Sequence, residues 1–170
     1  MGELKKPFRI QHQEQDQWCW AAVTASVCVF YEDAAHQQQC GLANHFLETV
    51  RGGTDCCSDG SSDDCNVPFG LSDALRELGR LNPPVRGPLT FQDLGQQIEA
   101  NRPIGVRIQL ADFSAHFIVV TACEETSDGR QWVKIADPGG VAGNVVTLEY
   151  EELVSNFRPG ATWDESYLTN

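Results

Sequence analysis

The sequence predicts an α+β protein in which helices come first and an antiparallel sheet follows. Apolar residues recur at helical spacing up to about residue 100, whereas from residue 103 they form short runs typical of strands. The chain has 170 residues, enough for one domain with a substantial core. We therefore expect a single domain over 1–170, with a helical lobe at about 13–100, a sheet lobe at about 101–170 and a cleft between them.

Four helices are expected in the first lobe. The first runs over about 19–32, and Asp16 or Gln17 is the expected N-terminal cap. Thr90 is the expected cap of the last. The other three helices are predicted at about 40–50, 71–78 and 91–100.

Five apolar runs in the second lobe predict the strands. They cover about 103–110, 116–123, 131–136, 145–148 and 163–168. The run from His116 to Cys123 is nearly continuous, so we place it at the centre of the sheet. A short helix at about 149–157 is expected before the last strand.

The charge balance limits the partners of the protein. Twenty-four acidic and twelve basic residues give a net charge of −12. Nucleic acids and anionic membranes are bound through basic patches, so neither is expected as the main partner. No apolar run approaches the roughly 20 residues of a membrane-spanning helix, and no apolar block follows the first lysines as a signal peptide would require. The oligomeric state is not predicted.

Seven cysteines are many for this length. Cys28 and Cys123 lie in apolar runs and are expected in the core. Four others share a polar region rich in Gly, Ser and Asp: Cys40, Cys56, Cys57 and Cys65. Because adjacent cysteines are not expected to bond to each other, Cys56 and Cys57 should each pair with Cys40 or Cys65. A zinc site is the competing interpretation, but its usual C-x₂₋₄-C spacing is absent. Disulfides would imply an oxidising destination.

Cys19 has the sequence context of a nucleophile. It lies between two tryptophans, before small residues and at the start of a predicted helix, whose N-terminal partial positive charge favours a thiolate. Gln13, six residues upstream, could direct its side-chain amide to the same place and form an oxyanion hole with the Cys19 N–H. The alternative is that Cys19 is a small buried hydrophobe.

A thiol nucleophile needs a base and a group that orients the base. Of the four histidines, His116 opens the most apolar strand after a turn-like segment. Asp137 ends the next strand and could lie beside His116 if the two strands are antiparallel neighbours, holding the ring in one tautomer. Two alternatives remain open, namely a buried histidine bonded to backbone and an ordinary Asp-Pro-Gly turn.

Three segments resemble the motifs of papain-like cysteine peptidases. They are Gln13 followed by Trp18-Cys19-Trp20, Ser114-Ala115-His116-Phe117-Ile118, and Ile135-Ala136-Asp137-Pro138. The Asp-Pro form and the compact length are similar to the bacterial branch, with its effector peptidases and bacteriocin-processing peptidases. The resemblance extends over about 12–168.

This resemblance implies a papain-like two-lobed fold with no cofactor and no metal. In it, Cys19 attacks the scissile carbonyl, His116 transfers the proton, Asp137 orients His116, and Gln13 with the Cys19 amide holds the oxyanion. Two features depart from papain. The chain has an adjacent cysteine pair, and Asp16 stands where papain has a cross-linking cysteine, so papain's disulfide pairing is not transferred.

The expected function is a cysteine peptidase that hydrolyses protein or peptide substrates through a thioester acyl-enzyme. An acyltransferase, deamidase or amidase with the same triad is one alternative, and a non-catalytic binding module of papain fold is another. We expect a protein that is secreted or delivered into another cell without a visible signal peptide, with a cytoplasmic location as the alternative.

Overall fold

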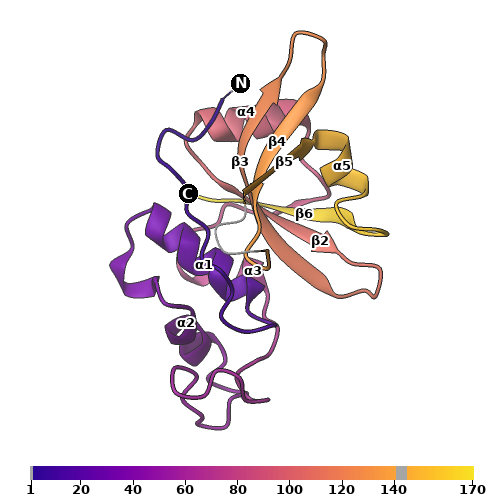
Figure 1. The fold of residues 1–170 in the computed structure, drawn as a ribbon. Coiled ribbons are helices and arrows are strands. Elements are labelled where there is room, and N and C mark those ends of the chain that lie inside the picture. Colours follow the sequence, from indigo (N-terminus) through magenta and orange to yellow (C-terminus); the bar gives the residue numbers. More distant parts are fainter. Residues whose placement is uncertain (1, 141–144) are drawn as a thin grey trace.

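The computed structural model describes residues 2–140 and 145–170. Its described residues form five helices and a six-stranded antiparallel sheet, and the first three helices lie together to one side of the sheet (Figure 1). The helices are α1 (Cys19–Phe30), α2 (Gln39–Phe46), α3 (Leu71–Glu77), α4 (Phe91–Glu99) and α5 (Tyr150–Ser155), with a 3₁₀ turn η1 (Ala34–His36). The strands are β1 (Val85–Arg86), β2 (Ile104–Gln109), β3 (Ala115–Glu125), β4 (Gln131–Ala136), β5 (Val145–Glu149) and β6 (Thr162–Leu168). The predicted α+β class is confirmed. None of the described helices has the length and apolar character needed to cross a membrane.

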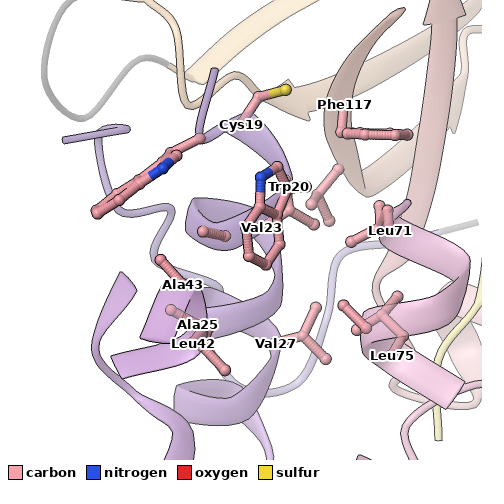
Figure 2. Close-up of a cluster of buried hydrophobic side chains, with 14 of the residues drawn as sticks. Cys19, Trp20, Val23, Ala25, Val27, Leu42, Ala43, Leu71, Leu75 and Phe117 are labelled. Atoms are coloured by element: carbon pink, nitrogen blue, oxygen red, sulfur yellow. The ribbon is translucent and has the colours of Figure 1, made fainter. Parts of the chain in front are cut away.

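Helix α1 is buried on nearly all sides. Side chains of α2, α3 and β3 surround it, as the close-up of their buried cluster shows (Figure 2). The hydroxyls of Thr24 and Ser26 donate to the carbonyls of Trp20 and Ala22 one turn earlier, at 2.7 and 2.6 Å. These bonds satisfy the hydroxyl groups of a helix in which every residue except Val29 is buried.

The predicted cap of α1 is wrong. Trp18 occupies the N-cap position, and no described side chain caps the helix. Asp16 and Gln17 lie inside a tight turn closed by a hydrogen bond from the Trp18 amide to the carbonyl of Gln15, at 3.0 Å. Since that turn ends only at Trp18, neither side chain is in position to accept from the first helical amides. Thr90 does cap α4, accepting from the Asp93 amide at 3.1 Å.

Two disulfides cross-link the polar region after α2. They join Cys40 to Cys57 and Cys56 to Cys65, so each of the adjacent cysteines pairs with a distant one, as expected. Cys28 and Cys123 are free and buried, which confirms their placement in the core. All four clustered cysteines are therefore engaged in disulfides rather than left as free thiols.

The sheet has the order β1-β6-β2-β3-β4-β5 with every pair antiparallel. Strand β3 is buried on both faces, as its continuous apolar run predicted. Phe117 and Val119 face the cluster around α1, whereas Ile118 and Val120 belong to a second cluster. Strand β3 therefore joins the two cores.

Helix α4 was expected to belong to the helical lobe, which was predicted to end near residue 100, but it packs with the sheet. Its apolar residues Phe91, Leu94 and Ile98 belong to the second cluster, together with the sheet residues Ile104 and Ile118. The helix thus covers the sheet rather than α1. The two-residue strand β1 was also not predicted, because it is too short to show any periodicity.

Candidate active site

Cys19 is the first residue of α1 and only 8% exposed. Figure 2 shows it at the tip of the helix, above the labelled core residues, with its sulfur turned towards the strand that carries Phe117. The first amides of α1 meet no capping side chain among the described residues. The partial positive charge of this helix end is therefore available to an anion at Cys19.

His116 is the second residue of β3 and lies opposite Ile108 of β2. Its side chain is buried, and its Nε2 is 2.6 Å from Oδ1 of Asp137. A carboxylate only accepts, so Nε2 is the protonated nitrogen in this bond and Nδ1 is left for Cys19. The register of β3 and β4 explains the contact, because Val119 pairs with Ala136 and so brings the end of β4 beside the start of β3.

The basicity of His116 is strongly altered by its neighbours. Burial disfavours the imidazolium, but hydrogen bonds to Asp137 and Cys19, together with their negative charges, outweigh burial and raise the pKa of His116 to about 9. At neutral pH the ring therefore favours its protonated form, which is the form that stabilises a neighbouring thiolate.

Asp137 is buried among three donors. The Nε2 of His116 and the Gly139 amide, at 2.9 Å, both donate to Oδ1, and Nη2 of Arg158 lies 3.1 Å from Oδ2. Burial disfavours the carboxylate, but the bond to His116 and its charge, the Gly139 amide and the Arg158 charge outweigh burial and lower the pKa of Asp137. The group is therefore an anion at neutral pH.

Gln13 reaches the site, but its amide hydrogens are already engaged. Its Nε2 donates to the carbonyls of Gln15 and Asp16 at 3.0 and 2.8 Å, and its backbone amide donates to Pro138 at 2.9 Å. Its Oε1 is buried and has no hydrogen-bond partner among the described residues. An oxyanion role for Gln13 therefore requires its side chain to turn.

Two residues of the site were not singled out in the sequence. A Cβ on Gly139 would lie 3.1 Å from Cε1 of His116 and 3.2 Å from Oε1 of Gln13, so a side chain there would press on both. The Asp-Pro-Gly turn could have indicated this glycine. Arg158 carries no local signal, since it is 21 residues away from Asp137 in the chain.

The fold and these residues define a protein with a cysteine at a helix N-terminus, faced by a histidine–aspartate pair on a sheet. Residues 1–152 match the family described as papain-like cysteine protease AvrRpt2, and the chain belongs to this family. The expected membership of the papain-like cysteine peptidases is thus confirmed. The chain is a papain-like cysteine peptidase, and its family implies protein substrates.

Solved structures similar to this chain include an avirulence protein and a protease. One is the Pseudomonas avirulence protein AvrPphB, with 10% identity, 96% of this chain and 97% of that chain covered, and a TM-score of 0.40. Another is the bromelain protease of Ananas comosus in complex with the E64 inhibitor, with 14% identity, coverage of 95% and 93%, and a TM-score of 0.48. No curated protein gives a match.

Proposed function

We propose that this chain hydrolyses peptide bonds, with Cys19 as the nucleophile, His116 as the proton carrier and Asp137 as the group that orients His116. The observation that carries the proposal is the buried His116–Asp137 bond of 2.6 Å. Cys19 is also one of the groups that raise the pKa of His116. A base held in one tautomer beside a thiol is the arrangement that nucleophilic catalysis by cysteine requires.

The proposed reaction uses the protonated ring of His116 and the carboxylate of Asp137. The Cys19 thiolate attacks the scissile carbonyl carbon, forming a C–S bond and a tetrahedral oxyanion. His116 donates its Nδ1 proton to the leaving amine as the C–N bond breaks, which leaves a thioester. A water molecule then attacks the thioester carbon and gives a proton to His116, forming a second tetrahedral oxyanion. This intermediate collapses as the C–S bond breaks, which releases the acid product and leaves the Cys19 thiolate beside the protonated ring.

The oxyanion is the charge that the site must stabilise. The Cys19 amide at the uncapped start of α1 is one donor that supports this role. The Gln13 amide is the second donor we propose, once substrate binding releases it from the carbonyls of Gln15 and Asp16. Each such donor is worth about 3 kcal/mol in transition-state stabilisation in known acyl-transfer enzymes.

We further propose that the protein is a delivered bacterial effector that passes through an oxidising environment. The two disulfides support this, because such bonds persist mainly outside the reducing cytosol. Native protein recovered with all seven cysteines reduced would contradict this proposal.

Selective alkylation tests the catalytic proposal. Iodoacetamide should label Cys19 far faster than Cys28 or Cys123, which serve as internal controls because burial raises the pKa of Cys28 to about 12 and raises the pKa of Cys123. The His116→Ala variant should lose the fast labelling of Cys19. Equal, slow labelling of all three cysteines in the native protein would contradict the proposal.

The products of a peptide library separate hydrolysis from the alternatives. New peptide termini, detected by mass spectrometry, are the result expected of a peptidase. An uncleaved peptide that gains the mass of a whole transferred group would instead indicate an acyltransferase. An uncleaved peptide that gains only about one mass unit would indicate a deamidase. The absence of any change, together with slow labelling, would indicate a binding module.

A further inference from the structure

We propose that Arg158 is a positioning residue of this active site, whose guanidinium holds the carboxylate of Asp137 in the orientation that His116 needs. The inference rests on the proposed function, since it concerns how the side chains of His116 and Asp137 are held in place for catalysis by Cys19. Arg158 does not touch the thiol or the ring; it acts through the carboxylate of Asp137.

The division of donors between the two carboxylate oxygens is the main observation. Oδ1 already accepts from His116 and from the Gly139 amide. Oδ2 accepts only from Arg158 among the described residues, at 3.1 Å, although Asp137 is just 6% exposed. Without Arg158, this buried oxygen would keep its negative charge with no donor, and rotation of the carboxylate would be free to weaken the bond to His116.

The surroundings of Arg158 place it for this role. It lies in the loop between α5 and β6, and its guanidinium carbon is 5.5 Å from the centre of the Phe157 ring. The loop approaches the connection between β2 and β3, since a Cβ on Gly160 would lie 3.1 Å from the Cβ of Ala111. The same connection precedes His116, so the loop that carries Arg158 is in contact with the segment that leads to His116.

The charges of the site balance only when Arg158 is present. Within residues 2–140 and 145–170, the other charged or titratable groups that act on Asp137 or His116 are Cys19 from α1 and Arg158 from the loop before β6. In the thiolate form of Cys19 that the proposed function requires, thiolate, imidazolium, carboxylate and guanidinium have charges that sum to zero. Removing Arg158 leaves one net negative charge, and a site with that excess binds a further proton at higher pH.

The pH dependence of Cys19 labelling tests the inference without depending on substrate choice. In the Arg158→Gln variant, the midpoint of the acid limb should move to higher pH by about half to one unit, both for the rate of Cys19 labelling and for kcat/KM. The shift is this small because the Arg158 side chain is half exposed and its charge is screened by solvent. At pH values below this midpoint, both rates of the variant should be about three- to tenfold lower than those of the native protein, with little difference near pH 8. Arg158→Lys should restore most of the shift.

Arg130→Gln is the matched control. Arg130 pairs with Asp128 on the exposed connection between β3 and β4, and its removal should leave both profiles unchanged. Profiles of Arg158→Gln that superimpose on the native ones, or that are lower by the same factor at every pH, would overturn the role of Arg158. Slow labelling of Cys19 in the native protein would instead overturn the proposed function, and this inference with it.

Discussion

The part of the chain that carries the thiol and the part that carries its base are held together in different ways. Around α1, two disulfides fix the segment from Cys40 to Cys65. In the sheet, the one described cysteine, Cys123, is free, and order comes from strand pairing and a separate apolar cluster. The comparison teaches that the nucleophile depends on covalent links, whereas the histidine–aspartate pair depends on strand register.

The cross-linked segment reaches the nucleophile through the two tryptophans that flank it. The indole nitrogen of Trp18 donates to the carbonyl of Cys65 at 2.8 Å, and that of Trp20 donates to Val67 at 3.2 Å. The Gln17 amide also donates to Asn66, at 2.9 Å. The start of α1 is therefore fixed to the segment that the Cys56–Cys65 disulfide closes.

The largest effect is expected from removing the imidazole of His116, the base that the sheet contributes. The His116→Ala variant should lower kcat/KM on the order of a thousandfold, because general acid–base catalysis typically contributes 10²–10⁴-fold. The change removes a group at the end of a strand, so the thermal midpoint should move by only a few degrees. Activity within tenfold of the native protein would show that the sheet does not supply the base.

A smaller effect on the other region is expected from removing its cross-link. Cys56→Ala with Cys65→Ala should lower the local stability around α1 by about 3 kcal/mol, the usual effect of a short disulfide loop. Hydrogen exchange should show faster exchange in α2 and the segment from 51 to 66, with β2 and β3 unchanged. An equal loss of protection in the sheet would mean that the two regions unfold as one unit.

A free-energy change similar to that of the disulfide is expected for stability against pH. Because the pKa of His116 is raised from 6.5 to about 9, its contribution is fully present below pH 6.5 and is lost as pH rises through about 9. The loss should be on the order of 3 kcal/mol in urea unfolding. The His116→Ala variant should lack this dependence, and a native protein equally stable at pH 6 and pH 10 would contradict it.

Much of the fold could be predicted because its signals are local. The helix starting at Cys19, the cap at Thr90 and the central strand after His116 each follow from spacing or residue type within a short window. The missing cap of α1 could not be predicted, since a turn closed between Gln15 and Trp18 competes with capping by Asp16.

The sequence by itself determined which residues could do chemistry here: a cysteine at a helix start, a histidine at a strand start and an aspartate at a strand end. Only the tertiary structure decided how they are supported. Strand register set the 2.6 Å bond of His116 to Asp137, and a loop far along the chain supplied Arg158. The physical reason is that propensity acts over neighbouring residues, whereas hydrogen bonds and charges act between groups that folding alone brings together.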